Sequence, residues 1–254
     1  MSKKLIAGNW KMNGGLAANE ALVKAIVAGM PAQACDVAVC PPALYVPQVQ
    51  QLLAGQTAVA LGAQDVSAHE SGAYTGDVAA AMLKEFGVRY AIVGHSERRQ
   101  YQGERDELVA IKAERLLSAG ITPIVCVGET LAQREAGDTE AVVRRQLAAV
   151  IHQVGQCVSE IIVAYEPVWA IGTGMVATPQ SAQDAARAIR NDLSDTFGTR
   201  VGETVRILYG GSVSSKNAVE LINEPDVDGF LIGGSALKVD ELTRICKLTL
   251  ETTA

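Results

Sequence analysis

At residues 161–167 the chain reads Ile-Ile-Val-Ala-Tyr-Glu-Pro, an apolar run that passes directly into a carboxylate and a proline. The run is continuously apolar and does not alternate with polar residues, which is typical of a strand buried on both faces of a parallel sheet. A segment that mixes polar and apolar residues at helical spacing follows at 181–197. Together they predict one strand followed by one helix.

The same unit recurs along the whole chain. Strands are expected at 4–7, 36–40, 57–62, 90–93, 122–127, 161–165, 205–209 and 229–232, with helices at 18–28, 45–53, 78–86, 104–118, 139–154, 181–197, 216–222 and 239–250. Eight units in 254 residues give about 32 residues each, the size of a strand–helix repeat. These units indicate an α/β fold, which could close into a barrel or form an open, doubly wound sheet. Their number and even length favour a single (β/α)8 barrel. No linker divides the chain, so residues 1–254 are expected to form a single domain.

Composition excludes several classes of protein. The apolar fraction of 48% excludes a disordered chain. A net charge of −6, with no basic run longer than Lys3-Lys4, argues against nucleic-acid binding. No apolar stretch approaches the roughly 20 residues that span a bilayer, so no membrane association is expected. The five cysteines are odd in number and lack a Cys-x-x-Cys pair, which favours reduced thiols in the cytoplasm.

Chemically useful side chains cluster directly after the expected strands. In a barrel the loops at the carboxyl ends of the strands carry the active site. Asn9 and Lys11 follow the first strand, His95 the fourth and Glu166 the sixth. A cation, an imidazole and a carboxylate are therefore expected on one rim.

Glycine pairs follow the last two strands, as Gly210-Gly211-Ser212 and Gly233-Gly234. Bare backbone lets N–H groups approach an anion closely, and barrels often hold phosphate at these two loops. One such pair alone would more simply be a tight turn, but two on adjacent strands favour a phosphate site. A weak G-x-G-x-x-A match at 172–177 does not directly follow a strand, and no P-loop motif occurs, so nucleotide binding is not expected. The three histidines lack partners at metal-ligand spacing, so no metal is expected.

The surroundings of each group suggest its role. Glu166 lies among Tyr165, Pro167 and Trp169, so partial desolvation should make it a stronger base. His95 precedes Ser96-Glu97, the expected start of a helix, which disfavours a charged imidazole. Lys11 would attract an anionic substrate to an otherwise acidic protein. Glu97 and Glu129 are more simply read as anchors for nearby basic residues.

Four motifs in order give the chain a family resemblance: residues 8–13 (Gly-Asn-Trp-Lys-Met-Asn), 93–99 (Val-Gly-His-Ser-Glu-Arg-Arg), 164–174 and 208–213. In these motifs, and in its length from residue 4 to about 250, the sequence resembles the triosephosphate isomerase family. The resemblance implies a single (β/α)8 TIM barrel without a cofactor, which interconverts dihydroxyacetone phosphate and glyceraldehyde 3-phosphate in glycolysis and gluconeogenesis.

The resemblance also implies residue roles. Glu166 would transfer a proton through an enediolate, a neutral His95 would polarise the carbonyl, and Lys11 with Asn9 would stabilise the negative charge. Phosphate would be held by backbone N–H groups at Gly172, Ser212, Gly233 and Gly234. Residues 167–177 would form a lid. Two departures concern Met175 at the tip of that lid and the order Ser235-Ala236 after the second glycine pair.

The long loop Gln64–Gly76 resembles the family segment that inserts into a partner subunit, which implies a homodimer with Thr75 in the interface. Two alternatives remain. One is another sugar-phosphate enzyme on the same fold, and the other is a barrel that binds sugar phosphate without catalysis. The presence of Lys11, His95 and Glu166 together argues against the second.

Overall fold

The structure, a computed structural model, describes residues 3–30, 35–171 and 177–252. It contains a closed barrel of eight parallel strands in sequence order, because β8 pairs with β1. The strands are β1 (Leu5–Asn9), β2 (Asp36–Cys40), β3 (Ala60–Ala63), β4 (Tyr90–Val93), β5 (Thr122–Val127), β6 (Ile162–Tyr165), β7 (Arg206–Tyr209) and β8 (Gly229–Ile232). This confirms the (β/α)8 fold class.

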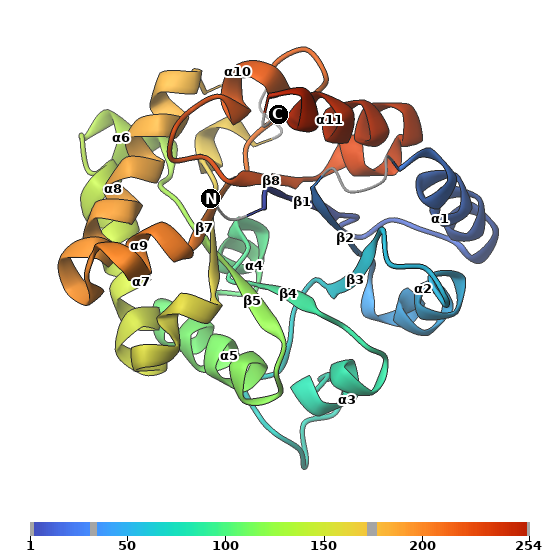
Figure 1. The fold of residues 1–254 in the computed structure, drawn as a ribbon. Coiled ribbons are helices and arrows are strands. Elements are labelled where there is room, and N and C mark those ends of the chain that lie inside the picture. The colour runs from blue at the N-terminus through green and yellow to red at the C-terminus, as the bar shows by residue number, and fades with distance from the viewer. Residues whose placement is uncertain (1–2, 31–34, 172–176, 253–254) are drawn as a thin grey trace.

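Helices surround the barrel, as Figure 1 shows. They are α1 (Leu16–Gly29), α2 (Val46–Leu52), α3 (Ala80–Glu85), α4 (Ser96–Tyr101), α5 (Asp106–Ser118), α6 (Leu131–Glu135), α7 (Thr139–Val154), α8 (Pro179–Phe197), α9 (Thr199–Thr204), α10 (Ala218–Ile222) and α11 (Val239–Glu251). Four short 3-10 helices add to them in the described ranges: η1 (Ala43–Tyr45), η2 (Gly155–Glu160), η3 (Val168–Ala170) and η4 (Gly234–Leu237).

Both faces of the strands are buried, as their continuous apolar runs predicted. In β6, Ile162 and Ala164 belong to an inner cluster of twelve residues that fills the barrel. Val163 and Tyr165 alternate with them and belong to the larger cluster between strands and helices. Successive side chains of a strand point to opposite faces, so a strand between two apolar layers needs no polar positions.

Some predicted boundaries differ from the structure. The third strand was expected at 57–62, yet β3 begins at Ala60. The Gln56 side chain donates to the carbonyl of Val59 (2.9 Å) and accepts from its N–H (3.1 Å), which holds the intervening residues in a turn. The short helices α6 and α9 were not predicted, whereas α4 begins at Ser96, where the start of a helix was expected.

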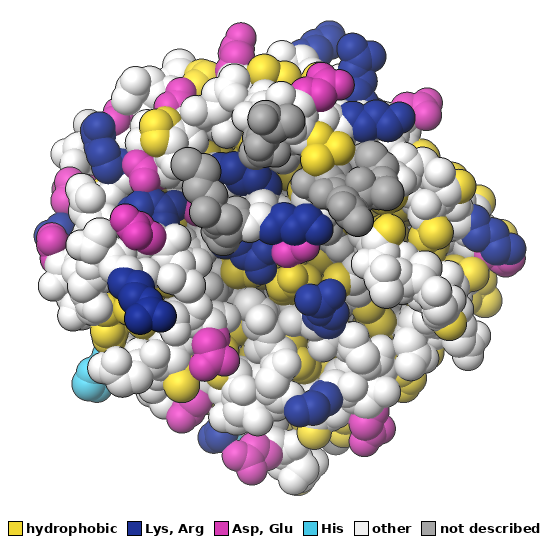
Figure 2. Space-filling model, in the orientation of Figure 1, with side chains coloured by type: hydrophobic (Ala, Val, Ile, Leu, Met, Phe, Trp, Pro, Cys, Tyr) yellow, Lys and Arg dark blue, Asp and Glu magenta, His cyan; other side chains and the backbone are white. Residues whose placement is uncertain are grey.

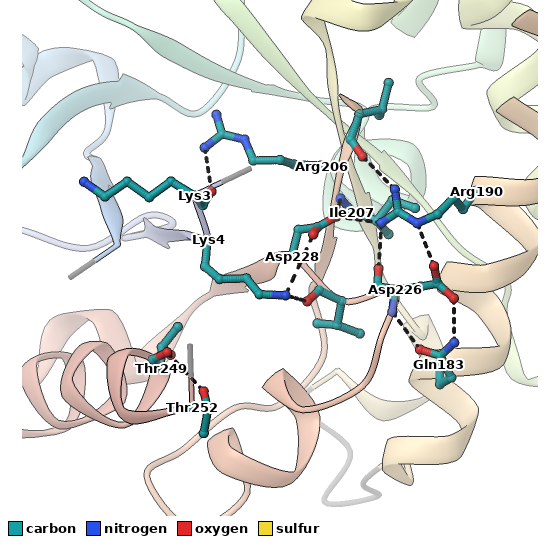
Figure 3. Close-up of polar contacts among 12 residues, drawn as sticks. Lys3, Lys4, Gln183, Arg190, Arg206, Ile207, Asp226, Asp228, Thr249 and Thr252 are labelled. Carbon is teal, nitrogen blue, oxygen red and sulfur yellow. Dashed lines mark hydrogen bonds and ion pairs between the residues drawn. The ribbon is translucent and has the colours of Figure 1, made fainter. Parts of the chain in front are cut away.

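Charged side chains close one end of the barrel. Side chains of both signs surround the middle of the face in Figure 2, and Figure 3 shows how several of them pair. Arg190 on α8 contacts Asp226 and Asp228, each at 2.7 Å, just before β8 begins. Lys4 reaches the carbonyl of Val227 and lies 3.8 Å from Asp228. These contacts lie at the amino ends of the strands, where barrels usually carry stability and not chemistry.

Candidate active site

A cavity of about 380 Å³ opens at the carboxyl ends of the strands. Its walls include seven of the predicted site residues: Asn9, Lys11, His95, Glu166, Ser212, Gly233 and Gly234. Ile171, Gly210 and Gly211 contribute to the same walls. Residues 172–176 of the predicted lid, which include Gly172 and Met175, lie outside the described residues. The barrel therefore brings together groups that are more than 200 residues apart in sequence.

Glu166 begins the loop after β6 and is buried, with 2% of its surface exposed. Its carboxylate makes two contacts with the residues after β4. One oxygen lies 2.9 Å from His95 Nε2, and the other accepts the backbone N–H of Ser96 at 2.8 Å. Gly210 leaves room for this side chain, because a Cβ there would lie 2.9 Å from Glu166 Cγ. Each oxygen of the carboxylate thus has a protein partner.

These donors correct the expected basicity of Glu166. Burial alone raises the pKa of a carboxyl group, as the sequence interpretation assumed. Here His95, the Ser96 N–H and Lys11 outweigh burial, so that the pKa of Glu166 is lowered from its ordinary value. Desolvation is present as predicted, but a stronger base is not, because neighbouring chain segments stabilise the ionised form.

His95 is the N-cap residue of α4. Its Nδ1 accepts the backbone N–H of Glu97 at 3.2 Å, which suits a neutral ring whose other nitrogen, Nε2, carries the proton. Burial lowers the pKa of His95, but the Glu166 carboxylate more than offsets it, so that the pKa is raised from its ordinary value. A neutral His95 throughout the working pH range stays a prediction.

We expect the pKa of His95 to fall in Glu166→Gln. The substitution removes the contact that raises this pKa most and leaves the burial that lowers it. The imidazole should then lose its proton at a lower pH than in the unmodified protein. A nitrogen-15 NMR titration of both proteins measures the two midpoints. An unchanged or higher midpoint in Glu166→Gln would show that the carboxylate does not govern His95.

Lys11 has a strained backbone. Its φ is +52°, the one positive value among the described residues other than glycine. The Asn9 side chain accepts the Lys11 N–H at 2.9 Å, and Gln64 donates to the Lys11 carbonyl at 2.8 Å. Its ammonium group pairs with Glu97 at the cavity wall, so that Glu97 is an anchor as predicted. The surrounding structure thus enforces a conformation that a lysine disfavours.

The glycine turns form the wall next to Lys11, because a Cβ at Gly233 would lie 3.1 Å from Lys11 Cε. The 3-10 helix η4 begins directly at Gly234, where an added Cβ would meet no atom within 4 Å. Open space over bare backbone suits a bound anion. Ser235, one of the two departures from the family pattern, donates its hydroxyl to the carbonyl of Val213 at 2.7 Å. Its hydroxyl is therefore used within the protein, while the backbone of the turn remains exposed.

Sequence reasoning missed how the segment after Glu166 is held. Glu129 has no exposed surface and accepts hydrogen bonds from Tyr165 (3.1 Å) and Trp169 (2.8 Å). Arg134 lies 3.6 Å from Glu129, so the predicted role of Glu129 as an anchor is confirmed. The Arg134 guanidinium also stacks over the Trp169 ring, 4.3 Å from its centroid. The sequence did contain one sign of this region, since Thr130 and Gln133 form a capping box at α6.

No group of three or more His, Cys, Asp or Glu side chains in residues 3–30, 35–171 and 177–252 is arranged to hold a metal ion. Among the helices of the same ranges, none combines the length and apolar character needed to cross a bilayer.

Comparison with known proteins gives concordant matches over nearly the whole chain. The sequence model of the family described as triosephosphate isomerase matches residues 4–249. The triosephosphate isomerase of Paracidovorax citrulli is 61% identical over 246 residues, which cover 96% of this chain and 97% of that protein. That of Albidiferax ferrireducens is 60% identical over 245 residues, covering 96% and 98%. That of Delftia acidovorans is 58% identical over 246 residues, with coverage of 96% and 98%.

Proposed function

Because the chain belongs to the triosephosphate isomerase family, we infer that it is an isomerase that interconverts dihydroxyacetone phosphate and D-glyceraldehyde 3-phosphate. One structural observation assigns the reaction to particular residues of this chain. Glu166 and His95 face each other at 2.9 Å in the wall of a cavity that also holds Lys11 and two glycine turns. A base, a hydrogen-bond donor, a cation and an anion site are what a proton transfer on a phosphorylated carbonyl compound requires.

We propose that Glu166 removes a proton from one carbon of the substrate and returns it to the next through an enediolate. Transfer requires the carboxylate to turn toward the substrate carbon, away from His95 and the Ser96 N–H that now contact its two oxygens. The same movement releases Nε2 of His95, which can then donate to the substrate carbonyl. The proposed acid and base thus occupy each other until a substrate separates them.

Lys11 and Asn9 complete the proposed chemistry. The Lys11 ammonium lies in the cavity wall and would stabilise the negative charge that develops on the substrate oxygens. Asn9 is 5% exposed and fixes the Lys11 backbone through its side-chain oxygen. Phosphate would bind at Ser212, Gly233 and Gly234 in the neighbouring glycine turns. Gly172 is proposed as a fourth donor on the strength of the family motif alone.

An isomerase assay on both triose phosphates, with excess chelator present, tests this function. Interconversion at full rate with chelator supports the proposed reaction without a metal. Activity on a different sugar phosphate alone would favour the first alternative, another enzyme on the same fold. Saturable binding of triose phosphate without turnover would favour the second, a barrel that binds without catalysis.

We propose that residues 1–254 form one catalytic domain that acts as a homodimer in the cytoplasm. The loop between β3 and α3 exposes Tyr74, and Met12 and Leu44 are 95% and 82% exposed. These side chains lie near a second cavity of about 550 Å³, which Met12 lines together with Gln64. Apolar side chains of this size around a groove favour burial against another chain. All five cysteines are free thiols, as suits the cytoplasm.

Light scattering is expected to give a particle of twice the 26.7 kDa chain mass. The interface should include Thr75 and its loop, placed beside Asn9 and Lys11 of the partner subunit. Substitution of Thr75 by Arg adds a large charged side chain to this loop and should shift the protein toward the monomer. A fully active monomer at low micromolar concentration would contradict the proposed dimer.

A further inference from the structure

Gln146 is a buried polar residue on the apolar side of α7. Only 6% of its surface is exposed, and its helix neighbours Val143, Leu147 and Val150 are buried with it. A buried amide is costly unless its donor and acceptor are both used. Gln146 satisfies both on one residue: Oε1 accepts the Gly128 N–H at 2.7 Å, and Nε2 donates to the Gly128 carbonyl at 3.2 Å.

The peptide group that Gln146 holds is also the one that holds Glu166. The link between Val127 and Gly128 donates its N–H to Gln146, while its carbonyl accepts the N–H of Glu166 at 2.8 Å. Gly128 is in close contact with the same residue, since a Cβ there would lie 1.8 Å from the carbonyl oxygen of Glu166. A single peptide group therefore connects the Gln146 side chain to the backbone of the proposed base.

The next residue extends this control to the segment after Glu166. The carbonyl of Glu129 accepts the N–H of Val168 at 3.2 Å, and its carboxylate accepts from Tyr165 and Trp169. Residues 127–129 thus contact the chain on both sides of Glu166. Two side chains reach residues 127–129 from the surrounding helices: Arg134 on α6 lies 3.6 Å from Glu129, and Gln146 on α7 bonds to Gly128.

We propose that Gln146 is a positioning residue for the isomerisation, which fixes the segment 127–129 and through it the backbone of Glu166. This inference rests on the proposed role of Glu166 as the base. A shift of about 1 Å in a reacting group can cost about 100-fold in rate. Gly128 follows β5, whereas the phosphate turns follow β7 and β8, so loss of Gln146 should reduce kcat and leave KM nearly unchanged.

The chain offers a matched control in Gln183 on α8. It is also buried, at 7% exposure, and its amide also makes both bonds to one residue (Figure 3). Its Nε2 donates to the Asp226 carboxylate at 2.6 Å, and its Oε1 accepts the Asp226 N–H at 3.0 Å. Asp226 precedes β8, at the end of the barrel opposite the cavity. Substituting either glutamine by Met removes two buried hydrogen bonds. Of the two glutamines, only Gln146 lies beside the proposed base.

We expect Gln146→Met to lower kcat about 10- to 100-fold with KM within about twofold of the unmodified value. Both variants should lower Tm by a comparable amount, roughly 5 °C, but Gln183→Met should leave kcat within about twofold of the unmodified value. An unchanged kcat in Gln146→Met, or an equal loss of kcat in both variants, overturns the proposal. Glu166→Gln is measured in parallel: if it is inactive while Gln146→Met is normal, only the positioning role fails, whereas an active Glu166→Gln refutes the base itself.

A second variant serves if Gln146→Met does not fold. Gln146→Glu keeps an acceptor for the Gly128 N–H but places a carboxylate oxygen against the Gly128 carbonyl. Burial raises the pKa of such a carboxyl group, and protonation restores a donor. Its kcat relative to the unmodified enzyme should therefore rise as the pH falls. A ratio that does not change with pH contradicts the proposal.

Discussion

Glu166→Gln is expected to fold normally and to lose most of its isomerase activity, with kcat reduced about 10²- to 10⁴-fold. A glutamine side-chain oxygen can still accept the Ser96 N–H that now holds one carboxylate oxygen at 2.8 Å. An amide cannot accept the proton from a substrate carbon, so the loss should affect turnover more than binding. The measurement is steady-state kinetics in both directions, with KM as the internal check on substrate binding.

Circular dichroism and thermal unfolding provide the control for this variant. Glu166 is 2% exposed and contacts two neighbouring segments, so a loss of activity has meaning only if the barrel remains intact. A folded Glu166→Gln enzyme that binds inorganic phosphate normally but does not isomerise supports the proposed base. Near-normal turnover in a pure preparation of this variant would eliminate Glu166 from that role.

The barrel and the walls of the cavity could be predicted because each depends on short, local patterns. An apolar run such as 161–165 specifies a strand buried on both faces, and the residue that follows it must lie at the carboxyl end. Repetition of this rule places Asn9, His95 and Glu166 on one rim without any knowledge of side-chain conformation. The structure adds the 2.9 Å contact between two of them, which depends on rotamers.

The supporting residues could not be predicted in the same way. Helical spacing from Val143 and Val150 places Gln146 on the apolar side of α7, but the local sequence does not indicate which group its amide contacts. Its partner Gly128 is 18 residues away, and their contact exists only once α7 packs on the barrel. The lowered pKa of Glu166 has the same origin, because its donors belong to a different strand–helix unit. The local sequence predicted the burial of Glu166 correctly, but tertiary contacts decide that its pKa is lowered and not raised.

Substitution of Lys11 is the second change with a large expected effect. Lys11→Met removes the cation from the cavity and should lower kcat/KM by about 10²- to 10³-fold, the usual cost of losing one group that stabilises developing charge. The pair that the ammonium makes with Glu97 is partly exposed, with 30% and 39% of the side chains accessible. Partly exposed pairs contribute little to folding, so activity should fall far more than stability. Kinetics together with urea unfolding separate the two effects.

Lys11→Gly separates the charge from the backbone strain. Both variants lose the ammonium, so both should be nearly inactive, but only glycine adopts a φ of +52° without steric cost. The left-handed conformation costs other residues about 1–2 kcal/mol, and the greater freedom of glycine in the unfolded chain offsets part of that gain. Lys11→Gly should therefore unfold at a higher urea concentration than Lys11→Met. Equal midpoints would mean that the loop relaxes around Met. The expected order would show that Lys11 lowers folding stability and is kept because the cavity requires its charge.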